Sequence, residues 1–351
     1  MNWRSCQLND VLELRYGRSL PERDRKYGDV PVYGSGGIGG WHDSALVSGP
    51  GVIVGRKGSV GTVFYETRNF FPIDTAYYVA PKTDEINIRF AYYLLCSLPL
   101  TSMNSDVAVP GLNRDRVMGL SVRVPGKAVQ QSIADILSAY DDLIGTNRRR
   151  MALLEEFARL LYREWFVRLR FPGYEHTPIL DGVPKGWERK TLGDSITLNY
   201  GKALKAEVRV EGEFPVYGSS GVVGTHEKPL VRGPAIVLGR KGNVGSVFWS
   251  SKSFYPIDTV YFVSPESSNL YLFYAFKFMH FISTDVAVPG LNRDFAYSRP
   301  LLHPPASLLR SFHESIEPIQ AQLDKLEETN QRLRAARDLL LPRLMSGALA
   351  V

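Results

Sequence analysis

The chain has 351 residues, which is enough for two or three domains with hydrophobic cores. Hydrophobic residues make up 44% and charged residues 22%, a composition that excludes an intrinsically disordered chain. The formal charge of +6 agrees with a nucleic-acid partner but does not require one, because many other proteins are equally basic.

No segment of the sequence predicts a membrane span or a signal peptide. The chain has no run of about 18 apolar residues, and its first residues, MNWRSCQLND, contain no apolar core. Cys6 and Cys96 do not form a Cys-x-x-Cys pair, which excludes zinc ribbons and zinc fingers. We therefore expect a soluble, cytoplasmic protein that binds no metal of its own.

One module is written twice in the sequence. PVYGSGGIGG at 31–40 returns as PVYGSSGVVG at 215–224, at a spacing of 184. The copies align without a gap from Trp3 to Pro81, and close to half of these positions are identical. The block DVAVPGLNRD occurs at 106–115 and again at 285–294, so the spacing falls to 179 and the second copy has a five-residue deletion. Such self-similarity is typical of a duplicated structural unit.

Each copy begins with a segment that predicts a mixed α+β domain. GVIVGRKGSVGTVFY at 51–65 indicates two strands joined by a glycine-rich turn, and PIDTAYYVAP at 72–81 indicates another strand. IRFAYYLLCSL at 88–98 indicates a helix. We expect these elements to form homologous domains with a curved, partly closed sheet, at 1–126 and 171–305.

A long helix is predicted after each domain, over 127–170 and 306–351. Apolar residues in both recur alternately four and three positions apart, the spacing of a coiled-coil seam, with a break near Arg337 in the second helix. The first seam consists of Ile133, Leu137, Tyr140, Ile144, Asn147, Met151, Leu154, Ala158, Leu161 and Trp165. The second consists of Leu309, Phe312, Ile316, Ile319, Leu323, Leu326, Asn330, Leu333, Leu340 and Leu344.

Two arrangements of these helices agree with the pattern. Each helix can pack on its own domain alone, or the two can pair as an antiparallel coiled coil. Their matched lengths favour the pair, which would bring Asn147 and Asn330 together, and a buried Asn pair fixes the register at a cost in stability. Pro318 is expected to kink the second helix or restart it, because proline lacks the N–H that the helix needs.

No recurring set of residues predicts catalysis. The chain lacks a Walker A loop, His-Glu-x-x-His, Gly-x-Ser-x-Gly and the Asn-Pro-Pro-Tyr-type tetrapeptide of amino-methyltransferases. Gly34, Gly36 and Gly39 match Gly-x-Gly-x-x-Gly, but Ser220 and Val223 break that match in the second copy. A turn-rich loop is the better explanation.

Two pairs of recurring polar residues are interpreted as non-catalytic. Asp74 and Asp258 lie in the repeated tetrapeptide PIDT, where local backbone or turn hydrogen bonding accounts for them. His42 and His226 recur without a third metal ligand or base, which favours a structural role or a DNA contact.

Several segments together resemble the specificity subunits of Type I restriction–modification systems. PGLNRDRVMGLSVRVPGKAVQQSIADILSAYDDLI at 110–144 is similar to the segment that follows a target-recognition domain in that family. The matching positions are Pro125, Gln131, Ile133, Ala134, Leu137 and Asp141. YREWFVRLRFPGYE at 162–175 and LLPRLMSGAL at 340–349 resemble the ends of the two conserved helices, and WERKTLGDSI at 187–196 resembles the start of a second recognition domain. The second copy departs from the pattern because RPLLHPPASLLRSF lacks the usual Gln.

The resemblance implies a non-catalytic subunit that reads a bipartite target in double-stranded DNA. Such a subunit binds two modification (methyltransferase) subunits, which carry S-adenosylmethionine, and through them restriction subunits, which use ATP and Mg²⁺ for translocation and cleavage. The helices set the distance between the two recognition domains. This chain is then expected to hold no cofactor itself.

Three repeated features are candidate DNA contacts, because cations bind phosphates and polar side chains read base edges. The first is the glycine-flanked turn that carries an Arg-Lys pair, and the second is an Asn-Arg pair. The third is a Tyr-Gly-Ser loop. A solvated surface turn is the alternative for each. The residues are Arg56, Lys57, Arg240 and Lys241; Asn113, Arg114, Asn292 and Arg293; and Tyr33, Ser35, Tyr217 and Ser219.

The repeat separates shared roles from specific ones. Positions identical in both copies are expected to serve the fold or contact phosphates, and loop positions that differ are expected to read bases. The segments 18–30 and 202–214 differ strongly, so they carry the candidate readers, although a merely variable surface loop is the alternative. These are Arg18, Arg23 and Lys26, and Lys202, Lys205 and Arg209.

Because the copies are so alike, we expect the two half-sites to be similar and the whole target to be close to palindromic around an unspecified spacer. Two other functions remain open. The chain could be a single-chain DNA-modifying enzyme, which the missing motifs disfavour, or a coiled-coil scaffold whose globular parts bind protein.

Overall fold

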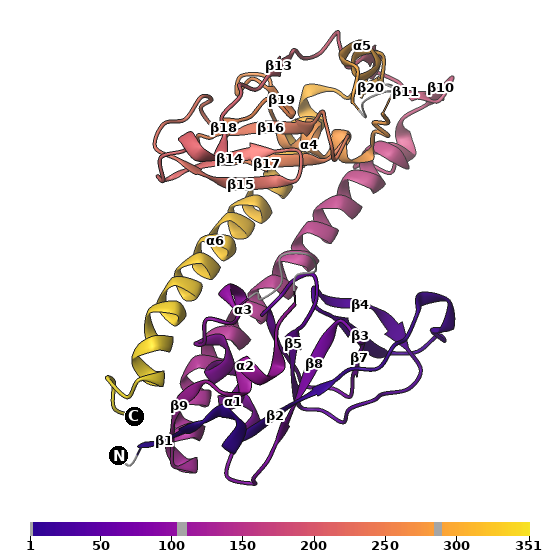
Figure 1. The fold of residues 1–351 in the computed structure, drawn as a ribbon. Helices are drawn as coiled ribbons and strands as arrows, with labels where there is room; N and C mark the ends of the chain where they lie inside the picture. The colour runs from indigo at the N-terminus through magenta and orange to yellow at the C-terminus, as the bar shows by residue number, and fades with distance from the viewer. Residues whose placement is uncertain (1–2, 104–110, 284–289) are drawn as a thin grey trace. The chain divides into compact units, whose positions relative to one another are not determined.

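A computed structural model describes residues 3–103, 111–283 and 290–351, and the chain in it forms two units. Unit 1 consists of 1–146 together with 329–351, and unit 2 consists of 147–328. Each unit therefore contains one of the two repeated domains and a segment of both long helices (Figure 1).

In unit 1 the strands form three separate sheets rather than the one curved sheet that the sequence suggested. Their bounds are β1 Trp3–Gln7, β2 Leu12–Tyr16, β3 Val30–Gly34, β4 Gly37–His42, β5 Gly51–Gly55, β6 Val63–Glu66, β7 Phe71–Pro72, β8 Ala76–Pro81 and β9 Ser121–Pro125. The orders are β2-β8-β5-β6, β4-β3-β7 and β1-β9, and β3–β7 is a parallel pair in an otherwise antiparallel set.

Unit 2 repeats this topology. The matching sheets are β13-β19-β16-β17, β15-β14-β18 and β12-β20, and β10–β11 is an additional hairpin. The strands are β10 Ile179–Leu180, β11 Val183–Pro184, β12 Glu188–Thr191, β13 Leu198–Tyr200, β14 Phe214–Gly218, β15 Gly221–His226, β16 Ala235–Gly239, β17 Val247–Ser250, β18 Tyr255–Pro256, β19 Val260–Val263 and β20 Pro300–His303. The predicted mixed α+β domain is therefore found twice.

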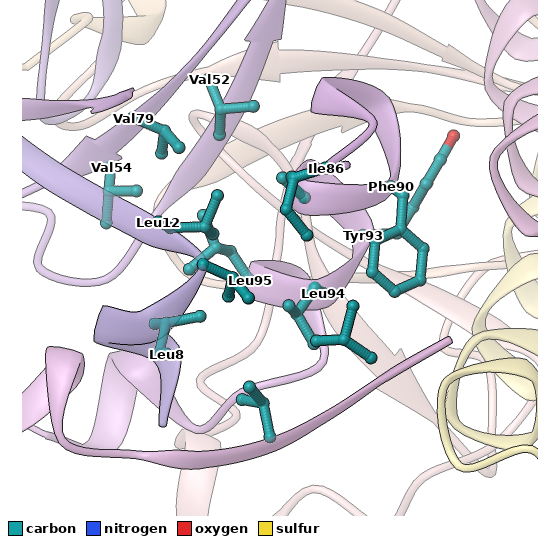
Figure 2. Packing of buried hydrophobic residues seen from close by; sticks show 14 of the residues in the cluster. Leu8, Leu12, Val52, Val54, Val79, Ile86, Phe90, Tyr93, Leu94 and Leu95 are labelled. Atoms are coloured by element: carbon teal, nitrogen blue, oxygen red, sulfur yellow. The ribbon is translucent and has the colours of Figure 1, made fainter. Parts of the chain in front are cut away.

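The centre of each domain is a short strand that is buried along its whole length. All five residues of β5, GVIVG, are buried, as are those of β16, AIVLG. Continuous apolar runs of this kind are typical of strands covered on both faces. One cover is a nine-residue helix, α1 Ile88–Cys96 in unit 1 and α4 Leu270–Phe278 in unit 2. Figure 2 shows Leu12, Val52 and Val79 of the sheet beside Phe90 and Leu94 of α1.

The remaining helices are α2 Arg114–Met118, α3 Lys127–Tyr162, α5 Arg293–Tyr297 and α6 Ala306–Met345. A π-helical turn, Arg163–Val167, follows α3 directly. Both long helices are continuous, so the two predicted helices are present.

In unit 1 the segments of α3 and α6 run antiparallel. Arg123, just before α3, donates to the carbonyl of Ser346, just after α6, at 3.0 Å. Further along α3, Asp141 accepts from Arg337 of α6 at 2.5 Å and from the Tyr93 hydroxyl of α1 at 2.6 Å. The apolar seam was expected to break near Arg337. At this position Arg337 of α6 forms an ion pair with Asp141 of α3, and Asp141 also accepts from Tyr93 of α1, so these contacts link three helices.

The helix segments of unit 2 are antiparallel as well. Phe166, after α3, packs against Phe312 near the start of α6 with ring centroids 4.9 Å apart. Further back along α3, Met151 and Glu155 line one cavity with Leu323 and Glu327 of α6. Asn147 and Asn330 are both buried, at 3% and 0% exposure, and their pairing with each other remains a prediction.

Of the two expectations for Pro318, a restart of the helix is wrong, and a kink at this residue stays a prediction. The chain is α-helical on both sides of this residue, as α6 runs from Ala306 to Met345. Pro318 lies on the exposed side of the helix, where water can satisfy the carbonyl that loses its N–H partner.

We expect the Asp141–Arg337 contact to be a measurable link between α3 and α6. In a double-mutant cycle of Asp141→Ala and Arg337→Ala, the coupling free energy should be about 1–3 kcal/mol, as for directly interacting side chains. Chemical denaturation of the full chain gives the four unfolding free energies. Asp142→Ala with Arg337→Ala is the control cycle, and equal coupling in both cycles would contradict the observed pairing.

Candidate nucleic-acid interface

Two predicted DNA contacts of unit 1 come together on one tyrosine ring. Arg56 follows β5 and Arg114 begins α2, yet the guanidinium carbons of both lie over Tyr16, at 4.9 and 5.5 Å from the ring centroid. Tyr16 is the last residue of β2 and is 51% exposed. The structure thus joins the Arg-Lys turn and the Asn-Arg pair, which are 58 positions apart in the chain, into one cationic site.

Unit 2 contains the same arrangement. Arg240 and Arg293 lie over Tyr200 at 5.1 and 5.4 Å, and Tyr200 ends β13 with 50% exposure. We call each set of three residues an Arg–Tyr–Arg site.

Backbone hydrogen bonds hold the first arginine of each site. Arg56 Nη1 donates to the carbonyl of Asp74 at 2.9 Å, and Arg240 Nη1 donates to that of Asp258 at the same distance. In the PIDT turn, the backbone carbonyl of the aspartate thus accepts the local hydrogen bond. The carbonyl of Arg56 in turn accepts from the N–H of Leu112 at 2.8 Å, which fixes the segment leading to Arg114.

A buried tyrosine supports each site from the sheet side. The ring of Tyr77 meets that of Tyr16 edge to face at 5.1 Å, and its hydroxyl donates to the carbonyl of Leu112 at 3.0 Å. Burial raises the pKa of Tyr77 to about 12, so its hydroxyl remains a donor at neutral pH. Tyr261 does the same under Tyr200, with a hydrogen bond of 3.1 Å to Leu291 and a pKa of about 12.

The asparagines of the Asn-Arg pairs act as helix caps. The side chain of Asn113 accepts from the N–H of Arg116 at 3.1 Å at the start of α2, and Asn292 accepts from Asp294 and Phe295 at the start of α5. An N-terminal cap of this type satisfies otherwise unpaired helix N–H groups. These two side chains therefore orient Arg114 and Arg293.

The Lys57 and Lys241 side chains lie on exposed turns beside the arginines. Each turn needs glycine, since Gly58 and Gly61 have φ of +80° and +75°. A side chain at Gly61 would also meet the carbonyl carbon of Leu100 at 2.4 Å. The turn thus presents its lysine and its backbone on a fixed, closely packed loop.

The Tyr-Gly-Ser loops support these turns instead of presenting tyrosine to solvent. Tyr33 and Tyr217 are buried, and the Tyr33 hydroxyl donates to Glu66 at 3.0 Å. The carbonyl of Ser35 accepts from the Thr62 hydroxyl at 2.5 Å, and that of Ser219 accepts from Ser246 at 2.6 Å. These contacts join the Tyr-Gly-Ser loop to the end of the arginine turn.

The variable segments 18–30 and 202–214 are attached to their domains by equivalent contacts. Arg25 Nη1 donates to the carbonyl of Gly39 at 2.7 Å, and the N–H of Lys26 donates to His42 Nδ1 at 3.0 Å. In unit 2, Arg209 donates to Val223 at 2.8 Å and Val210 donates to His226 at 3.2 Å. The two histidines thus accept hydrogen bonds that hold these segments.

The candidate base readers of these segments differ in their surroundings. Arg209 also lies within hydrogen-bond distance of the carbonyl of Leu204, so its guanidinium is occupied inside the loop. The other five side chains are exposed: Arg18, Arg23, Lys26, Lys202 and Lys205.

Tyr16 and Tyr200 are the functional candidates that the sequence interpretation missed. They are identical in the two copies, immediately before Gly17 and Gly201. That identity was the available signal, but only the fold shows that two distant arginines meet on each ring.

Neither a metal site nor a membrane span is found in the described parts of the chain. Over residues 3–103, 111–283 and 290–351, no group of three or more His, Cys, Asp or Glu side chains could hold a metal ion. None of the helices within these ranges is both long and apolar enough to cross a bilayer.

The fold defines a protein of two homologous α+β domains, each followed by a long helix. The family model described as "Type I restriction modification DNA specificity domain" matches residues 1–156 and 184–294. Because these ranges cover more than half of the chain, the chain belongs to this family of specificity subunits of Type I restriction–modification systems.

Similar proteins agree with this assignment. The MjaIX specificity subunit of Methanocaldococcus jannaschii is 22% identical over 309 residues, which cover 78% of this chain and 71% of that protein. The HindI specificity subunit of Haemophilus influenzae is 22% identical over 362 residues, with 77% and 79% covered. The crystal structure of an S subunit from M. genitalium has the same fold, with a TM-score of 0.64, 20% identity, and 98% and 96% of the two chains covered.

We expect the tyrosine ring to be the part of the site that keeps both arginines in place. Tyr16→Leu together with Tyr200→Leu should weaken binding of duplex DNA by roughly thirtyfold or more, because four cation–π contacts of about 0.5–1 kcal/mol each are lost. Tyr16→Phe with Tyr200→Phe keeps the rings and serves as the matched control. Binding titrations of the full chain with duplex DNA would measure both, and an equal loss in the two variants would refute the role of the ring.

Proposed function

We propose that this chain reads a bipartite target in double-stranded DNA, one half with each unit, through the two Arg–Tyr–Arg sites and the segments beside them. The observation that carries the proposal is the recurrence of the same three-residue site on both copies of the domain. The distances from the arginines to the ring centroid differ by at most 0.2 Å between the two sites.

The Arg–Tyr–Arg sites suit contacts to the phosphate backbone. Two guanidinium groups on one ring concentrate positive charge, and Lys57 or Lys241 adds a further cation on the neighbouring turn. Arginine and lysine provide the cations that phosphates require, and such contacts carry no sequence information. Identity between the copies agrees with this role, since both half-sites have the same backbone.

Base reading is assigned to residues that differ between the copies. Arg18, Arg23 and Lys26 in unit 1, and Lys202 and Lys205 in unit 2, are exposed on segments held by equivalent anchors. Arg209 is one of these anchors in the structure, so its contribution would be to position the segment.

The two half-sites are proposed to be similar in sequence, so that the target is close to palindromic around a spacer. The near-identity of 31–81 and 215–265 supports this similarity. The proposed domain limits are 1–126 and 171–305, with the helical regions 127–170 and 306–351 setting the distance between the recognition domains.

Catalysis is proposed to reside in partner subunits. Two modification subunits would carry S-adenosylmethionine, and restriction subunits would carry ATP and Mg²⁺, with the whole complex in the cytoplasm. Leu153 and Phe157 support docking of a modification subunit on α3, because they are one helical turn apart and are 72% and 55% exposed. Docking would remove these two apolar side chains from water.

Genome-wide mapping of methylated adenines in the host tests the near-palindromic target. We expect one bipartite motif whose halves agree at most positions when one is read on the opposite strand. Deletion of the gene for this chain should abolish the motif. Two unrelated half-sites would contradict the proposal.

Salt dependence tests the phosphate role of the Arg–Tyr–Arg sites. Arg56→Ala should weaken binding to all duplex sequences alike and reduce the slope of log K against log salt by about one. Arg240→Ala is expected to do the same, and Arg15→Ala, on the β2 strand next to Tyr16, is the control. Unchanged affinity and slope would show that the Arg-Lys turn is a solvated hairpin that does not contact phosphate.

Two measurements separate the alternatives. Binding of S-adenosylmethionine by the isolated chain would favour a single-chain modifying enzyme. Failure to retain DNA in a pull-down, both alone and with modification subunits, would favour a protein-binding scaffold.

A further inference from the structure

A third arginine of unit 1 is fixed on the surface, outside the Arg–Tyr–Arg site. Arg68 lies in the turn after β6, where its Nε donates to Glu66 Oε1 at 3.2 Å and its Nη2 donates to Oε2 at 3.1 Å. Its guanidinium carbon lies 5.3 Å from the ring centroid of Trp41 on β4. The side chain nevertheless remains 53% exposed.

Glu66 is itself held rigidly. It is buried, and it accepts hydrogen bonds from the Tyr33 hydroxyl at 3.0 Å and from the backbone N–H of Arg68 at 2.9 Å. Burial opposes its ionisation, but the hydrogen bonds from Arg68 and Tyr33 outweigh this effect and lower its pKa. Glu66 is therefore a charged support for Arg68 at neutral pH.

The contacts with Glu66 leave one edge of the guanidinium for another acceptor. Arginine has five N–H donors, and Glu66 takes the one on Nε and one on Nη2. The remaining edge, with Nη1 and the second N–H of Nη2, has the fork geometry that pairs with two neighbouring acceptors. Guanine offers such a pair, O6 and N7, in the major groove.

The buried charge of Glu66 needs a partner, but that need alone does not explain why the partner is an arginine whose side chain stays 53% exposed. The effect of the arrangement is to hold a half-exposed guanidinium in one orientation, between a carboxylate and a ring. A fixed orientation lowers the entropy that arginine would lose on binding a base edge.

Unit 2 has other residues in place of the arginine, its carboxylate and its ring. At the matching positions, spaced by 184, Thr225 replaces Trp41, Ser250 replaces Glu66 and Lys252 replaces Arg68. The Ser250 hydroxyl donates to the backbone carbonyl of Lys252 at 2.8 Å. Lysine has a flexible point charge in place of the planar fork, and Thr225 and Ser250 supply neither the ring nor the carboxylate that orients Arg68.

We propose that Arg68 reads a guanine in the half-site bound by unit 1, and that the half-site bound by unit 2 has no matching guanine preference. The inference rests on the proposed function, that each unit reads one half of a DNA target. If Arg68 reads this guanine, the two half-sites are similar in sequence but differ at this position. Glu66 and Trp41 are then positioning residues for Arg68.

Selection from a duplex library randomised in both half-sites tests the assignment, with the full chain in complex with its modification subunits. The unchanged protein should enrich guanine at one position of one half-site. Arg68→Lys, which keeps the charge, and Arg68→Ala should each reduce that enrichment by on the order of tenfold, while other positions stay as they were. Lys252→Ala, the matched change in unit 2, should leave that position unaffected.

Salt dependence gives a second readout. Loss of a base contact leaves the slope of log K against log salt unchanged, so Arg68→Ala and the unchanged protein should have equal slopes. Uniform weakening on all sequences with a slope lowered by about one would show a phosphate contact and overturn the inference. Thermal unfolding of Arg68→Lys and Trp41→Phe checks that the domain remains folded, and Trp41→Phe should retain the guanine preference because the ring is kept.

Transfer to unit 2 is the most demanding test. The triple change Thr225→Trp, Ser250→Glu and Lys252→Arg should create a guanine preference at the matching position of the other half-site. Undiminished guanine enrichment by Arg68→Ala would overturn the role of Arg68 while leaving the proposed function intact. Absence of any sequence preference in the unchanged protein would instead overturn the proposed function.

Discussion

Both recognition domains depend on burial of the two long helices against them. The core of unit 1 contains Ile133 and Leu137 of α3 together with Leu344 of α6, although about half of the chain separates these helices in sequence. The core of unit 2 contains Ala158 of α3 and Ile316 of α6. Unit 1 therefore consists of two separate pieces of chain, whereas unit 2 is one continuous segment, and in each the apolar face of the domain is covered by residues of both helices.

The Arg–Tyr–Arg site follows from this packing. Tyr16 ends β2 of the sheet that α1 covers, Arg56 follows the buried strand β5 of the same sheet, with β8 between the two strands, and Arg114 starts α2. The Tyr77 hydroxyl and the carbonyl of Arg56 tie Leu112, and with it the start of α2, to that sheet. Because these contacts are made by buried or backbone groups, the two guanidinium groups are positioned before any ligand binds.

The sequence alone predicted the features that depend on local pattern. The duplication, the strands at 51–65 and 72–81, the helix at 88–98 and the two long helices are all present. Their signals are short-range, since burial on both faces produces continuous apolar runs and a helix seam produces spacings of three and four. The strands at 51–65 and 72–81 join the four-stranded sheet, but the division into several sheets depends on long-range pairing, which no local signal reports.

The candidate site was predicted only in part, for the same reason. Arg56 and Arg114 were identified from charge and repetition, but their meeting on Tyr16 joins three distant segments. Tyr33 looked like a loop residue because of its glycine and serine neighbours, yet its ring lies in the core and its hydroxyl reaches Glu66. Pro318 looked like a helix break because its exposure to water cannot be deduced from the residue alone.

Comparison of the copies shows which residues the shared scaffold keeps and which it changes. The residues that attach the variable segments are retained, with Arg25 matched by Arg209 and His42 by His226. Exposed residues close to these anchors differ between the copies; Arg23, for example, is replaced by Glu207. Since surface substitutions away from packed features change stability little, such a domain can change what it reads without weakening its core.

The arrangement around Arg68 requires more than a surface substitution, because its carboxylate support, Glu66, is buried and hydrogen-bonded to Tyr33. Retention of Tyr217 beside Ser250 in unit 2 shows that the core accepts the loss of that carboxylate while the domain keeps its fold.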